Sequence, residues 1–332
     1  MDLLIILLIS FGPMFVYAAL LWWLDRYEKE PLALLGFAFL WGAIPSIILS
    51  LILELILDVP IAALSGENAL AYNLLGASLS APIIEEGTKA LAVLGLFIAF
   101  PREIDSPLDG LIYGGMAGFG FAAVENFFYL IGGYANAGLG GAIGLGFLRA
   151  GLFGLNHAMY TAFTGLGVAL ALELRRAWRF VLPVVGLGLA VAAHAYHNTF
   201  ATFWGFTERG SMLLTAVVGD WAAVLILLVV AVWARWLEGR RIRAYLNQGY
   251  AHRETLSADE VRMLSSPWRR RLARWGTLFN KGPERWWERG RFYHLITEAA
   301  FKWHRAQKGD AKSAEKLQRL EAKLRQRPAA GL

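Results

Sequence analysis

Three charged residues lie inside a long apolar stretch, where they could do chemistry. The segment SAPIIEEGTKALAVLGLF, residues 80–97, contains Glu85, Glu86 and Lys89 among apolar and small residues. Residues i and i+4 of a helix share a face, so we expect an ion pair between Glu85 and Lys89. Two carboxylates against one lysine leave one carboxylate unpaired. Ionisable groups at membrane depth are costly and are retained mainly for function.

Other apolar segments carry polar residues of the same kind. These residues are Glu125, Asn126, Asn156, His157, His194, His197 and Asn198. Helices that each contribute carboxylates and imidazoles to one interior form the metal sites of helix bundles. The set could therefore hold a divalent cation, zinc being the first candidate, and without a metal a carboxylate and an imidazole could still activate water. Glu54 and Asp220 also occur in apolar segments, nearer to the segment ends and without clustered partners.

The composition predicts the environment in which such residues would work. Of the 332 residues, 57% are hydrophobic and only 17% are charged, which is typical of a polytopic membrane protein rather than a soluble domain. The chain has no cysteine, which excludes disulfides, cysteine-ligated metal sites and cysteine nucleophiles. Seven segments are long and apolar enough to cross a bilayer. They are residues 2–24, 32–57, 69–100, 110–132, 146–172, 180–204 and 211–236.

The basic residues of the loops predict an orientation. The loops 25–31, 101–109 and 173–179 contain Lys or Arg, whereas 58–68 and 133–145 contain none. Positive loops stay in the cytoplasm. With seven spans in the cell membrane, this pattern places the N-terminus outside and the C-terminal tail in the cytoplasm.

The tail differs in composition from the rest of the chain. Residues 237–332 hold 22 Lys and Arg against 10 Asp and Glu, whereas residues 1–236 hold 10 against 16. The tail segments PWRRRLARWGTLF and ERWWERGRFYHLI mix arginine with tryptophan and tyrosine. This mixture suits helices on an anionic membrane surface, and it also occurs in proteins that bind nucleic acid. Because the tail follows a predicted span directly, we favour anionic lipid headgroups as its partner.

Five motifs in chain order resemble the PrsW family of bacterial intramembrane proteases, which is grouped with the CAAX prenyl endopeptidases and the Abi proteins. The motifs are DRYEKEP, EEGTK, DGLIYGGMAGFGFAAVEN, NHAMYTAFTG and HAYHN, within residues 10–205. The resemblance implies that Glu85 and Glu86 are the essential glutamates, with Glu85 activating water. It also implies that His157 is a further site histidine and that the substrate is a membrane-anchored protein of the anti-sigma-factor kind.

The resemblance assigns the last motif, His-x-x-x-Asn, to His194 and Asn198, so that Asn198 would stabilise the oxyanion. Phe121 and Glu125 stand where prenyl endopeptidases have Phe-x-x-x-His, so a carboxylate replaces an imidazole. We therefore expect Glu125, His157 and His194 to bind the metal. In supporting roles we expect Lys89, Phe121, Asn126 and His197.

A proton-coupled transporter or channel is the alternative function, because intramembrane Glu, His and Lys also form proton relays. Many transporters are built from two similar halves, but residues 1–120 and 121–236 show no internal repeat. A non-catalytic scaffold would leave the buried carboxylates without a purpose. We therefore predict an all-α membrane protease domain at 1–236 with about seven spans, followed by a basic, helical cytosolic tail at 237–332.

Overall fold

The computed structural model describes residues 1–25, 27, 29–101, 103–104, 106–174, 178–250 and 256–325. These residues fold into helices and contain no strand. They divide into two compact units. The first, here called the membrane unit, comprises residues 1–24 and 30–231, and the second, the tail unit, comprises residues 25–29 and 232–332. The functional boundary after residue 236 stays a prediction.

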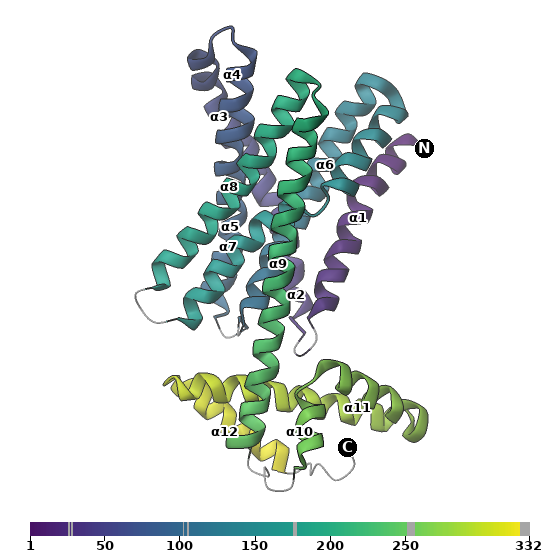
Figure 1. Ribbon diagram of the computed structural model, residues 1–332, viewed down its shortest axis with the longest axis vertical. Coiled ribbons are helices and arrows are strands. Elements are labelled where there is room, and N and C mark those ends of the chain that lie inside the picture. The colour runs from purple at the N-terminus through teal and green to yellow at the C-terminus, as the bar shows by residue number, and fades with distance from the viewer. Residues whose placement is uncertain are drawn as a thin grey trace. The chain divides into compact units, whose positions relative to one another are not determined.

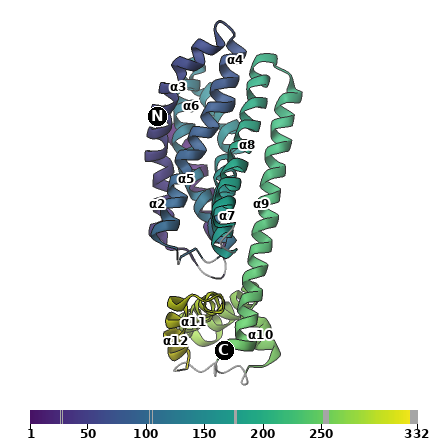
Figure 2. The same ribbon diagram turned by 90° about the vertical axis from the view of Figure 1, so that its left-hand side faces the viewer.

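The membrane unit is a bundle whose long helices run roughly parallel to one another (Figures 1 and 2). Three segments of it, labelled η, are π-helical and widen the helical turn. In chain order its elements are α1 (Asp2–Leu24), α2 (Leu32–Trp41), η1 (Gly42–Ser46), α3 (Ile47–Ser65), α4 (Ala69–Asn73), η2 (Leu74–Ser80), α5 (Ala81–Ala99), α6 (Pro107–Gly146), η3 (Phe147–Leu152), α7 (Asn156–Glu173), α8 (Trp178–Thr207) and the first part of α9 (Gly210–Ala244).

Within the described part of the chain, five helical stretches are long and apolar enough to cross a membrane. They are Asp2–Leu24, Leu32–Ser65, Pro107–Glu173, Trp178–Thr207 and Gly210–Gly249. Helix α5, which carries Glu85, Glu86 and Lys89, is not one of them. The predicted all-α membrane bundle is therefore confirmed, while the number of seven spans stays a prediction.

The longest stretch, Pro107–Glu173, reverses direction within α6. The backbone leaves the helical conformation at Ala137 and Gly138, where Gly138 has a φ of 60°. Beyond this break the helix folds back, so that a β-carbon at Gly141 would lie 2.6 Å from the carbonyl oxygen of Gly133. The continuous helix predicted for 146–172 is also interrupted, because η3 and a turn precede α7.

Glycines allow α6 and α7 to touch backbone to backbone. A β-carbon at Gly110 would lie 2.2 Å from the carbonyl oxygen of Gly165, and one at Gly118 would lie 2.2 Å from that of His157. Gly114 meets the carbonyl oxygen of Thr161 in the same way. This contact fixes the position of His157 on α7.

The tail unit has a core of its own. It contains the end of α9, η4 (Tyr245–Gly249), α10 (Ala258–Leu264), α11 (Pro267–Gln307) and α12 (Ala311–Arg325). Tyr27 belongs to this core and donates a hydrogen bond of 2.8 Å to the carbonyl oxygen of Ser265. Helix α11 is divided at Gly282, where φ is 83°. The expected helical tail is thus a folded unit.

Candidate active site

Helix α5 buries all three of its ionisable residues. The exposed fractions are 7% for Glu85 and 0% for both Glu86 and Lys89. The Nζ atom of Lys89 lies 2.6 Å from Oε1 of Glu86 and 3.3 Å from Oε2 of Glu85, so the expected ion pair is present and includes both carboxylates. The same ammonium lies 3.9 Å from the ring centroid of Phe121. A single cation therefore serves two buried carboxylates.

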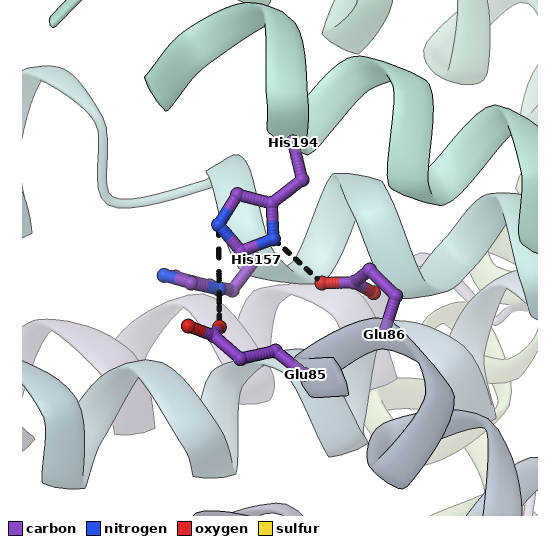
Figure 3. Close-up of side chains that lie close together, drawn as sticks. All are labelled: Glu85, Glu86, His157 and His194. Carbon is purple, nitrogen blue, oxygen red and sulfur yellow. Dashed lines mark hydrogen bonds and ion pairs between the residues drawn. The ribbon is translucent and has the colours of Figure 1, made fainter. Parts of the chain in front are cut away.

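His194 of α8 is held by one of these carboxylates and faces the other. Its Nδ1 atom lies 3.1 Å from Oε1 of Glu86, and its Nε2 atom lies 4.0 Å from Oε2 of Glu85 (Figure 3). An ionised carboxylate only accepts hydrogen bonds, so Nδ1 carries the hydrogen. The lone pair on Nε2 is then directed toward Glu85.

His157 of α7 shows the same arrangement with its nitrogens exchanged. Its Nε2 atom lies 2.7 Å from Oε2 of Glu125, and its Nδ1 atom lies 4.0 Å from Oε2 of Glu85 (Figure 3). The ammonium of Lys89 lies 3.1 Å from this Nδ1. An ammonium has no lone pair, so Nδ1 must be the acceptor. Each histidine thus has one nitrogen fixed by a glutamate and presents the lone pair of the other to Glu85.

The donor atoms of this cluster fit a divalent metal ion. Glu85, Glu86, His157 and His194 each offer a ligand atom, and these atoms lie within 4.8 Å of one another. Zinc binds imidazole nitrogen and carboxylate oxygen at about 2.0–2.2 Å, so ligands of one ion are separated by roughly 3–4 Å. The two 4.0 Å separations from Glu85 match this spacing. A carboxylate behind each histidine is also the usual support of a histidine ligand.

A cavity of about 850 Å³ opens onto the cluster. Glu85 lines it, whereas Glu86 and Lys89 do not. The cavity extends along α3 to Asp58 and is bounded on another side by α8 and α9. Besides Glu85, its lining includes nine of the residues singled out in the sequence, namely Glu54, Phe121, Glu125, Asn126, Asn156, His157, His194, His197 and Asn198.

Comparison with known proteins identifies the family. The model of the PrsW family of intramembrane metalloproteases matches residues 30–234, which is more than half of the chain. The chain belongs to the PrsW family. "Protease PrsW" of Clostridioides difficile (strain 630) is 32% identical over 141 residues, which is 42% of this chain and 55% of that protein. "Protease PrsW" of Geobacillus kaustophilus (strain HTA426) is 31% identical over 144 residues, with the same coverage.

The matched region spans about half the length of these two curated PrsW proteins. No solved structure matches the chain significantly. The PrsW family model includes the EEGTK, NHAMYTAFTG and HAYHN motifs and ends before the tail. The wider grouping with CAAX prenyl endopeptidases and Abi proteins stays a prediction.

Arg149 is a polar residue of this PrsW family member that the sequence did not place in the cluster. It lies on η3, and its Nη2 and Nε atoms donate to Glu125 at 2.5 Å and to Oδ1 of Asn126 at 3.0 Å. Its guanidinium lies 3.7 Å from the ring centroid of Tyr129. Arg149 stands near the start of the predicted span 146–172, where basic residues commonly flank a membrane segment. Glu125 is thus shared between Arg149 and His157.

A second polar group lines the same cavity. Oδ2 of Asp220, on α9, accepts hydrogen bonds from Nδ1 of His197 at 2.7 Å and from Nδ2 of Asn156 at 2.9 Å. The expectation that Asp220 has no clustered partner is wrong, because α9 brings it to α7 and α8. Glu54 lies on the cavity wall, and its buried Oε1 atom has no hydrogen-bond partner among the described residues.

Asn198 completes the hydrogen bonding of η2. At the end of this π-helical segment, the N–H of Ala81 donates to the carbonyl oxygen of Gly76, five residues back. The next residue, Pro82, has no N–H and cannot donate to the corresponding carbonyl of Ala77. Nδ2 of Asn198 supplies this bond at 2.7 Å. The sequence gave no sign that Asn198 compensates for Pro82.

Proposed function

We propose that the chain is an intramembrane metalloprotease that hydrolyses a peptide bond of a membrane-anchored protein. One observation carries the proposal. Nδ1 of His157 and Nε2 of His194 both lie 4.0 Å from Oε2 of Glu85, while Glu125 and Glu86 fix the other nitrogen of each ring. This is a donor set for a catalytic metal, and it lies at a cavity within the membrane unit.

His157 and His194 would hold the ion, zinc being the first candidate, with Oε2 of Glu85 as the nearest oxygen donor. A bound ion would supply Lewis-acid activation of water and of the peptide carbonyl. Glu85 is the α5 carboxylate that lines the cavity, so we assign to it the acceptance of the water proton. Lys89 balances the carboxylate charge, and Glu86 keeps the ring of His194 in position.

The geometry refines two roles inferred from the resemblance. Glu125 was expected to bind the metal, but its pairing with Nε2 of His157 and with Arg149 favours a role in orienting His157. Asn198 was expected to bind the oxyanion, and its amide already donates to Ala77. We therefore propose that both residues position the site rather than contact the reacting atoms.

The remaining parts of the proposal concern partners and orientation. The substrate would be a membrane-anchored protein of the anti-sigma-factor kind, as the resemblance implies. The basic loops favour an external N-terminus and a cytoplasmic tail in the cell membrane. The composition of the tail favours anionic lipid headgroups as its second partner.

The test is cleavage of a panel of single-span membrane proteins by the full-length chain in liposomes. We expect Glu85→Gln and His194→Ala to lower the rate at least about 100-fold, the scale of a lost acid–base or metal function. The exposed carboxylate variant Glu67→Gln is the matched control and should keep the wild-type rate. A chelator should stop cleavage, zinc should restore it, and metal analysis should find less bound metal in His194→Ala.

Folded Glu85→Gln protein that cleaves at the wild-type rate would refute the proposal. Proton flux through sealed liposomes, present in the wild type and absent in the same variant, would establish the transporter alternative.

A further inference from the structure

The first half of α11 exposes an apolar stripe. Trp268, Leu272, Trp275 and Phe279 follow one another at intervals of four, three and four residues, so they lie on one face of the helix. Their exposed fractions are 61%, 69%, 45% and 80%. On the opposite face Arg270 is buried in the tail unit. Soluble surfaces seldom expose a contiguous row of large apolar side chains unless it binds something.

A cationic cavity of about 590 Å³ lies within the same unit. It is lined by Arg274, Trp287, Gly290, Arg291, His294, Leu295 and Lys323. Three of these residues carry a fixed positive charge and none is acidic. Glu298 lies 4.0 Å from His294 and also pairs with Lys316 at 2.8 Å. Among the described residues, the cavity wall therefore offers only donors to an anion.

Arg274 is held in place within this cavity. Its guanidinium lies 3.7 Å from the ring centroid of Trp286, and its Nε atom donates to the carbonyl oxygen of Trp286 at 3.3 Å. A β-carbon at Gly290 would lie 2.7 Å from the guanidinium carbon, so the glycine makes room for the stacked arginine. A planar, preordered guanidinium is suited to bind phosphate oxygens in pairs.

Arg274 links the stripe to the cavity, because it stands between Leu272 and Trp275 in the chain, while the rest of the lining comes from the second half of α11 and from α12. Tryptophan is enriched where a membrane meets water, and basic residues beside an apolar face bind anionic headgroups. Helix α11 contains ten Lys and Arg against three Glu. We propose that α11 binds the surface of an anionic bilayer, with its apolar stripe in the interface and a lipid headgroup phosphate in the cavity.

The absence of cysteine from the chain provides the test. A nitroxide attached through Phe279→Cys, in full-length protein in vesicles, reports immersion through its relative accessibility to oxygen and to a water-soluble nickel complex. We expect this ratio to rise at least threefold when phosphatidylglycerol is added to phosphatidylcholine. A label at Glu315→Cys, which is exposed on α12, should report water in both lipids.

Two triple variants that remove the same amount of charge distinguish binding in the cavity from general electrostatic attraction to the membrane. The cavity variant combines Arg274→Gln, Arg291→Gln and Lys323→Gln. The control variant removes three exposed cations outside the cavity lining, by Arg285→Gln, Lys312→Gln and Arg319→Gln. We expect the cavity variant to lose the response to phosphatidylglycerol and the control variant to keep it, with the same helix content by circular dichroism.

Four results would overturn the proposal. The label at position 279 could respond equally to both lipids, or the two triple variants could behave alike. Displacement of the label from anionic vesicles by inorganic phosphate would identify a free phosphate as the ligand, and displacement by an RNA oligonucleotide would identify a nucleic-acid surface. The inference rests on the lipid partner given to the tail in the proposed function, but its readout is independent of proteolysis, so failure here and failure of the protease proposal are distinguishable.

Discussion

The two units bury a cation in different ways. In the membrane unit, Lys89 lies between two carboxylates and a histidine. In the tail unit, Arg270 forms no ion pair with a described carboxylate and donates instead to the backbone carbonyls of Leu264 and Tyr293 and to the hydroxyl of Thr297. The first arrangement keeps unneutralised negative charge at a cavity, where it can act on a ligand. The second satisfies donors with neutral acceptors and holds helices together.

Substitution of Lys89 and of Arg270 should give the largest difference between the two units in stability and cleavage. Lys89→Met leaves two carboxylates buried without their cation, which destabilises a protein by about 3–5 kcal/mol, and we expect cleavage to be lost. Arg270→Met leaves only neutral acceptors unpaired, at about 1–3 kcal/mol, and cleavage should stay within a few-fold of wild type. Thermal unfolding and the liposome cleavage assay measure both effects.

Lys89→Met combined with Glu86→Gln serves as the control for charge. It should recover stability, because the excess buried charge is reduced, but not activity. A more severe loss of cleavage in Arg270→Met than in Lys89→Met would reverse the roles given to the two units.

The hydrogen bond of Asn198 is a neutral contact in the membrane unit, and its contribution to stability can be compared with that of the neutral contacts of Arg270 in the tail unit. Asn198→Ala should lower the unfolding free energy by about 1–3 kcal/mol, because the carbonyl of Ala77 is left unpaired. Pro82→Ala restores a backbone N–H donor, so Asn198→Ala should lower the unfolding free energy by less in the Pro82→Ala background. A double-mutant cycle on thermal stability and cleavage measures the coupling. A loss of cleavage that is equal in both backgrounds, without loss of stability, would favour the oxyanion role.

The smallest expected effect concerns pH and the neutral contacts of the tail. Burial raises the pKa of Tyr27 to about 12, against 10.0 for an ordinary tyrosine. The contribution of its hydroxyl is fully present below pH 10 and is lost as the pH rises through 12, at about 1.4 kcal/mol per pKa unit. Hydrogen exchange of α10 and α11 should therefore accelerate across this range. Tyr27→Phe should flatten the dependence, and an unchanged slope in that variant would contradict the assignment.

The sequence was informative where the geometry is local. The pairing of Glu85 with Lys89 follows from helical spacing alone, and the apolar segments marked the helices because their length and composition are set by the bilayer. The pattern also brought His157 and His194 into one candidate site, since few polar side chains are available in the spans.

The partners across helices could not be predicted, because they depend on packing. Arg149 reaches Glu125 from a π-helical turn, and Asp220 reaches His197 from α9. The reversal at Gly138 falls within the predicted loop 133–145, but the sequence did not show that helix continues on both sides of it. The exposed stripe of α11 was visible in the sequence as an aromatic, basic segment, but the cavity beside it depends on the bend at Gly282.

The glycine contacts between α6 and α7 limit the routes by which a polypeptide could approach His157. Gly110 and Gly118 lie against backbone atoms of α7. The side of His157 that faces α6 is therefore closed to a substrate. The cavity wall is formed elsewhere by α3, η2, α8 and α9. A substrate helix arriving from the lipid would have to slip between those elements and unwind locally, because its own hydrogen bonds shield the amide to be cut. Under the proposed function, residues that destabilise the substrate helix near the scissile bond would then favour cleavage.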